Sequence, residues 1–279
     1  MEGVPRPNKH ESPSEPSAGK VQTVYEGAGE RWSARPEHPP SREYVDFEIE
    51  AARILAEKLN QSLVDVARDY TTLLHGHLWP GTERYIDAEG MSPGELTDAL
   101  YAREQEEYKD LPSLEYHEDT RYGCFTYHHQ IDVPVVDIHF KNAENDEDSP
   151  LSKGKMQNRQ QELRDMLIEI KREYPETKEI EGKSWLYALD SYRRLFPESY
   201  TESREETVAT STRDVSSGSS WGQFIDGKKG LRKDLADQFL ANLRALKEVT
   251  LEGIRQAFPL KTYRVRGPIA DFYAKYGTE

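Results

Sequence analysis

The chain contains one cysteine, Cys124, and no long apolar run. A single cysteine excludes an internal disulfide. A membrane-spanning helix needs roughly 20 consecutive apolar residues, and no stretch approaches that length. The chain also begins without the apolar segment of a secretory signal. These absences lead us to expect a cytoplasmic protein with no membrane partner.

Two phosphate-binding motifs are also missing. The sequence has neither a Walker loop nor the Gly-x-Gly-x-x-Gly fingerprint of dinucleotide-binding folds. Nucleotide hydrolysis and dinucleotide redox chemistry are therefore disfavoured. The formal net charge of -14 argues against nucleic-acid binding, because phosphate neutralisation needs a basic surface.

Aromatic residues are plentiful by contrast. The hydrophobic fraction is only 35% and the charged fraction is 32%, but 16 Tyr, 8 Phe and 4 Trp supply large side chains that can be buried. This composition predicts an ordered core that is rich in aromatic rings.

Composition divides the chain into a tail and one domain. Residues 1–40 hold seven of the 16 prolines and no Leu, Ile or Phe. Such a segment cannot bury enough apolar surface to offset the entropy of ordering, so we expect it to be disordered. The remaining residues suit a single α/β domain. We divide it into a helical part at 41–111, a sheet core at 112–210 and a mostly helical part at 211–279.

Three capping signals mark the first helices. Ser41 and Ser62 each precede apolar residues at spacings of three and four, which is the period of an amphipathic helix. Ser92 precedes Pro93, and proline suits the first turn of a helix. The pattern predicts a helical hairpin and a third helix that ends near Lys109.

The sheet core begins where the apolar period shortens to two. Residues 113–140 alternate aromatic and β-branched side chains, which predicts a three-stranded antiparallel meander. A helix from about 151 or 152 to Tyr174 and a strand at 178–187 would then form a β-α-β unit. The expected fold class is mixed α/β, with a mainly antiparallel sheet packed by helices.

The last third gives weaker signals. Residues 201–209 are typical of an exposed edge strand, and the Ser, Thr and Gly content of 210–220 predicts a mobile loop. Two helices, a last strand and a final helical turn are expected near residues 231–246, 251–258, 263–265 and 268–273.

Two places could carry chemistry. Asp137 and His139 share one face of their predicted strand, because side chains alternate along a strand, and this spacing suits an acid/base pair. The segment Ser152, Lys153, Gly154 and Lys155 lies between a predicted strand and the start of a long helix. Backbone N–H groups, the helix dipole and two lysines converge there, which suits an anion. The structural alternative for Asp137 and His139 is a polar cluster, and the alternative for residues 152–155 is an ordinary capped helix start.

Histidines offer a second kind of site. His75 and His77 flank a glycine, and further histidines fall within residues 117–139. Imidazole is a common metal ligand, so either group could serve a metal-dependent hydrolase. The structural alternative for His75 and His77 is the end of a helix, and the alternative for the histidines within residues 117–139 is a polar cluster. We predict no bound metal. Cys124 lies in a predicted strand, which favours a small buried residue over a nucleophile.

The order of elements between residues 113 and 210 resembles the central part of the GNAT-type N-acyltransferase fold. The meander, loop, long helix, strand and short helix ending in Tyr192 to Pro197 carry the resemblance. It implies an acyl-coenzyme A cosubstrate with its pyrophosphate at Ser152, Lys153, Gly154 and Lys155. For such a transferase, we predict from their positions that Asp137 or His139 takes a proton from an amine, small-molecule or protein, and that Tyr192 donates one to the leaving thiolate.

Three strings are also similar to those of a bacterial protein family without an assigned activity, which implies no function. They are Ser184 to Tyr187, Arg193 to Pro197 and Ser220 to Phe224. The sequence thus favours an acyltransferase. A non-enzymatic interaction or regulatory protein and a metal-dependent hydrolase are the alternatives.

Overall fold

A computed structural model describes the chain at residues 41–73, 91–110, 121–130, 132–142, 144, 148–226 and 230–278. All of these residues belong to one unit, Arg35–Glu279. The predicted tail, the expected first strand of the meander near Leu114 and the pair His75 and His77 lie outside the described residues.

The predicted N-terminal helices are confirmed. Helix α1 spans Arg42–Leu59 and α2 spans Leu63–Tyr70. The Ser41 and Ser62 hydroxyls cap them by accepting hydrogen bonds from backbone N–H groups 3.2 and 3.1 Å away. Helix α4 spans Pro93–Asp110, as its proline predicts.

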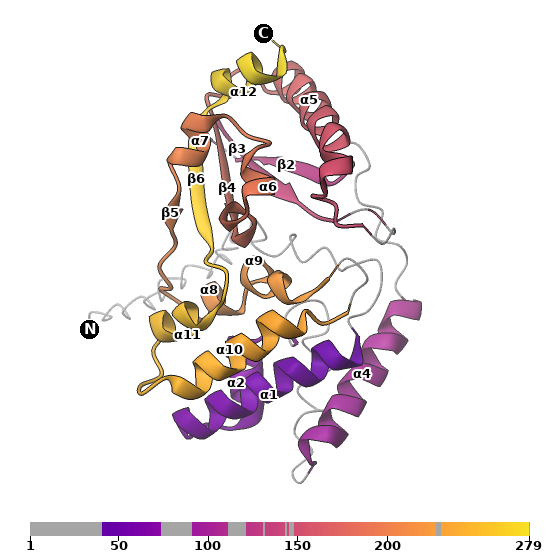
Figure 1. The fold of residues 1–279 in the computed structure, drawn as a ribbon, viewed down its shortest axis with the longest axis vertical. Helices are drawn as coiled ribbons and strands as arrows, with labels where there is room; N and C mark the ends of the chain where they lie inside the picture. The colour runs from indigo at the N-terminus through magenta and orange to yellow at the C-terminus, as the bar shows by residue number, and fades with distance from the viewer. Residues whose placement is uncertain are drawn as a thin grey trace, which may run out of the picture. The chain divides into compact units, whose positions relative to one another are not determined.

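These helices pack with the C-terminal ones in a helical core (Figure 1). It also contains α8 (Thr212–Ser216), α9 (Gly218–Trp221), α10 (Lys233–Ala245) and α11 (Leu251–Ala257). At its centre the rings of Phe47, Trp221, Phe224, Phe239 and Phe258 meet at centroid distances of 4.5 to 6.0 Å. Several of these pairs are edge-to-face, and such contacts add to the stabilisation from burial. The expectation of an aromatic core is confirmed.

The sheet has six strands in the described residues, in the order β1-β2-β3-β4-β6-β5. They are β1 (Arg121–Tyr122), β2 (Phe125–His129), β3 (Val135–Phe140), β4 (Glu179–Ser184), β5 (Glu205–Glu206) and β6 (Tyr263–Pro268). Only the β3–β4 pair of this sheet is parallel. Mixed α/β class, a mainly antiparallel sheet and the β-α-β unit are therefore confirmed.

Helices cover one face of the sheet and form a second core with it. Helix α5 (Met156–Glu173) is the β3–β4 crossover, and α6 (Asp190–Arg193), α7 (Glu198–Glu202) and α12 (Ile269–Tyr276) contribute to the same core (Figure 1). We call this side of the sheet the helix face. In the described ranges no helix has the length and apolar character to cross a bilayer.

Turn residues explain the strand boundaries. Gly123 joins β1 to β2 with a φ of 56°, and Asp132 follows β2 with a φ of 68°, both in the left-handed region that suits glycine and tolerates aspartate. Pro134 stands just before β3, where it needs no N–H, and its carbonyl accepts from the N–H groups of Lys178 and Glu179.

Two local expectations were wrong. The strand expected through Tyr187 ends at Ser184, whose hydroxyl accepts from the N–H of Leu186 and starts a 3₁₀ turn. The loop predicted at 210–220 holds α8 and α9. The last strand, expected near residues 263–265, is present as β6, and it lies inside the sheet between β4 and the edge strand β5.

Candidate functional site

Strands β3 and β4 separate partway along their length. Their parallel register covers three pairs, which are Val135 with Glu179, Val136 with Ile180 and Asp137 with Glu181. Beyond these pairs β3 continues to Phe140 against β2, and β4 continues to Ser184 against β6. We call the unpaired strand segments at residues 138–140 and 182–184 the fork. It lies at the carboxyl ends of two parallel strands, where α/β sheets commonly bind ligands.

Buried tyrosines close the fork on the helix face. Tyr187 and Tyr200 place their hydroxyl oxygens 2.9 Å apart, and a side chain at Gly182 would overlap both hydroxyls. Tyr192 packs against Phe140 at 5.4 Å between ring centroids. Burial raises the pKa of all three phenols well above 10. Gly182 thus lets polar hydroxyls reach the backbone of β4.

The opposite face of the sheet is polar. Asp137, His139 and Glu181 lie on it, and Asp137 is the register partner of Glu181. The Gln130 amide donates to Asp137 at 2.9 Å, and the Arg264 guanidinium pairs with Glu181 at 3.0 Å. We call this side the polar face.

The His139 imidazole is neutral at pH 7. Burial, with a smaller contribution from His128, lowers its pKa to about 4. A neutral imidazole is the form that accepts a proton, although a pKa this low makes it a weak base.

The structure therefore brings together two of the three predicted catalytic residues. Asp137 and His139 share the polar face, whereas Tyr192 lies in the core on the helix face with 1% of its surface exposed. Burial raises the pKa of the Tyr200 phenol on the helix face, and the charges of Glu181 and Asp137 on the polar face add to this increase.

The predicted anion-binding segment begins the crossover helix. Ser152 precedes a 3₁₀ turn formed by Lys153–Lys155, and α5 follows directly. Lys153 and Gly154 are exposed, whereas the Lys155 ammonium pairs with Glu144 at 2.6 Å. Within the described residues no carboxylate pairs with Lys153. Lys153 is thus the cation of this segment that remains available to an anion.

A buried ion network fixes this helix start. Arg159, 2% exposed, pairs with Glu144 at 2.6 Å and with Glu162 at 2.7 Å. Glu162 also accepts from the N–H of Cys124, whose sulfur contacts the Arg159 guanidinium. Cys124 is buried, as predicted, and the network ties the start of α5 to the β1–β2 turn.

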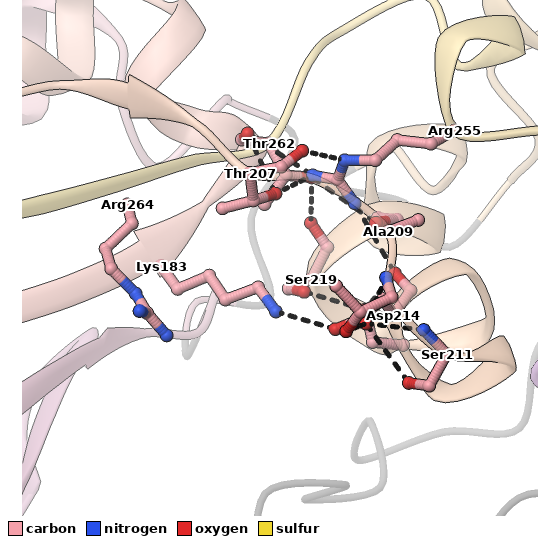
Figure 2. Close-up of polar contacts among 12 residues, drawn as sticks. Lys183, Thr207, Ala209, Ser211, Asp214, Ser219, Arg255, Thr262 and Arg264 are labelled. Atoms are coloured by element: carbon pink, nitrogen blue, oxygen red, sulfur yellow. Dashed lines mark hydrogen bonds and ion pairs between the residues drawn. The ribbon is translucent and has the colours of Figure 1, made fainter. Parts of the chain in front are cut away.

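A second network joins β4 to the helical core (Figure 2). Lys183, on the polar face of β4, reaches Asp214 at 3.4 Å. Asp214 caps α8 by accepting from the N–H and hydroxyl groups of Thr210 and Ser211. Beside it the buried Arg255 guanidinium donates to backbone carbonyls, including that of Thr262 at 3.3 Å. The position of β4 is therefore coupled to the packing of the C-terminal helices.

The meander histidines are divided between the two faces. His128 and His139 lie on the polar face, whereas His129 stacks on Tyr174 at 4.3 Å on the helix face. Among the described residues there is no group of three His, Cys, Asp or Glu side chains that could hold a metal ion. His75, His77 and His117 are not among those residues.

Residues Gly218–Gly222 match the Gly-x-Ser-x-Gly pattern of hydrolase nucleophiles, which was not among the motifs expected to carry chemistry. A nucleophile elbow needs a strained turn from a strand into a helix. Here α9 follows another helix, α8, and the Ser220 hydroxyl is buried 3.3 Å from that of Thr262. The pattern lacks the structural context of a nucleophile.

Sequence reasoning missed the residues that shape the fork, namely Glu181, Gly182, Tyr187 and Tyr200. The available signal was a glycine inside a strand, which often marks a close approach of other groups to the backbone.

No family model, curated protein or solved structure matches the chain.

Proposed function

We propose that the protein is an acyl-coenzyme A-dependent N-acyltransferase and that the fork holds the cosubstrate. The observation that carries the proposal is the separation of β3 and β4 after three pairs, at the end where α5 begins. The order β1, β2, β3, α5, β4 and α6 supports the proposal, because the resemblance drawn from the sequence rests on a meander, a long helix, a strand and a short helix in that order.

The residues present fit coenzyme A chemically. Its pantetheine arm contains two amides, and the facing edges of residues 138–140 and 182–184 do not pair with each other. Extended amide-bearing chains bind such edges through backbone hydrogen bonds. At the start of α5, Lys153 and the backbone N–H groups suit the pyrophosphate. Lys155 has a lesser role, because Glu144 balances its charge.

Acyl-coenzyme A, when bound, supplies an activated thioester. The protein must remove a proton from the attacking amine, and Asp137 and the neutral His139 are the two groups on the polar face of β3 that can accept it. The raised pKa of the Tyr192 phenol leaves that group protonated at neutral pH, which is the state of a proton donor. Its role as donor to the thiolate stays a prediction.

Calorimetric titration with acetyl-coenzyme A tests the proposal. Lys153→Ala removes the available cation, and we expect it to weaken binding about tenfold, as for loss of one charge-assisted hydrogen bond. Lys178→Ala is the matched control, because this exposed lysine lies before β4 at the end away from the fork. Absence of heat from the wild type at millimolar ligand contradicts the proposal, as does equal weakening by both variants.

One observation favours the alternative of an interaction protein. Strand β5 pairs only with β6 in the described sheet, and Val208 just beyond it is 67% exposed. An open edge of this kind can accept a strand from a partner. Purification of the full chain as a stable complex that Val208→Lys disrupts, together with no response to acetyl-coenzyme A, supports this alternative.

A further inference from the structure

The turn Arg193–Pro197 borders a surface depression of about 330 Å³. It connects α6 to α7, and Lys275 of α12 reaches into the same depression. This volume lies within the range of small-molecule sites, roughly 300 to 1,000 Å³. The turn belongs to a string that the sequence singled out and that the proposed acyl transfer does not use.

The depression has a positive balance of charge. Three cations line it, Arg193, Arg194 and Lys275, against two carboxylates, Asp190 and Glu198, in a protein whose formal net charge is -14. Arg193 and Asp190 form an ion pair, so their charges cancel. The remaining cations, Arg194 and Lys275, outnumber Glu198.

These two cations have no acidic partner among the described residues. Lys275 donates to the carbonyls of Arg194 at 3.1 Å and Phe196 at 2.7 Å, which leaves one of its three N–H donors for another group. Burial lowers the pKa of the Lys275 ammonium, because the group has lost water without gaining a carboxylate. Arg194 is exposed at the rim.

We propose that this depression binds a phosphate group, either as the free ion or as a phosphomonoester. Arg194 and the third donor of Lys275 supply charge-assisted hydrogen bonds, which are shorter and stronger than neutral ones. Glu198 opposes the anion and limits its affinity. The site is separate from the fork and does not depend on acyl transfer.

Backbone amide NMR shifts of the full chain, titrated with inorganic phosphate at constant ionic strength, test this site. We expect the amides of the Arg193–Phe196 segment to shift. Arg194→Ala should weaken binding about tenfold. Arg213→Ala, an exposed arginine on α8, should leave it unchanged.

The acidic residues of α7 give a test with the opposite sign. Glu198→Gln should tighten phosphate binding, whereas Glu202→Gln, on the same helix but outside the depression, should not.

A titration with glycerol phosphate distinguishes the two ligands proposed. Tighter binding than that of inorganic phosphate identifies a phosphomonoester, and equal or weaker binding identifies the free ion. Lys153→Ala should have no effect, which separates this site from the fork. The proposal is overturned if these amides do not shift, or if Arg213→Ala weakens binding as much as Arg194→Ala.

Discussion

Protonation of His139 should couple the stability of the sheet to pH. The pKa of this imidazole falls from 6.5 to about 4 on folding. Between these values the unfolded chain binds a proton that the folded chain does not, so the free energy of unfolding falls as pH is lowered. At pH 5 the unfolded histidine is almost fully charged and the folded one mostly neutral. The loss relative to pH 8 is about 2 kcal/mol.

Urea unfolding at pH 8 and pH 5 measures this term. His139→Gln should lose about 2 kcal/mol less than the wild type over this interval. Burial raises the pKa of Glu48 and Glu162, and this change favours the folded state as pH falls. Both carboxyl groups are present in the wild type and in His139→Gln, so their contributions cancel when the two losses are compared. Thr126→Ser, at the register partner of His139, removes a methyl group but no titrating group and should keep the wild-type loss. Equal losses in the wild type and His139→Gln would refute the reasoning.

Three further substitutions test the packing at the fork and in the network that joins β4 to the helical core. Gly182→Ala should destabilise the protein by about 2 kcal/mol in urea unfolding, because the new methyl group overlaps the Tyr187 hydroxyl, and an unchanged midpoint would contradict the packing described. Arg255→Met should lower the free energy of unfolding by about 3 kcal/mol, because the carbonyl of Thr262 and others lose a buried donor. Asp214→Ala should lower it by about 1 kcal/mol through loss of the α8 cap, and hydrogen exchange should localise the effect to that helix.

Local signals in the sequence predicted most helices. Ser41, Ser62 and Pro93 begin helices where their chemistry requires it, and the apolar stripes identify the buried faces. The helix at 212–216 could also have been found, because Ser211 and Asp214 form a capping box that is visible in the sequence. The abundance of Ser, Thr and Gly around it masked that signal.

The fork could not be predicted from local patterns. It depends on how far two strands about 40 residues apart stay in register, and register is set by packing across the whole sheet. The central place of β6 has the same origin, because its neighbours β4 and β5 precede it by many residues. Side chains alternate along a strand, so the sequence correctly predicted that Asp137 and His139 lie on the same face of the sheet.

Hydrogen exchange of the backbone amides with and without acetyl-coenzyme A tests the central claim most directly. If the cosubstrate binds between the separated strands, saturating ligand should protect amides within residues 138–140 and 182–184 and at the start of α5. Amides of α10, in the helical core, should exchange at unchanged rates. Saturating ligand that leaves both fork segments unprotected would contradict the account.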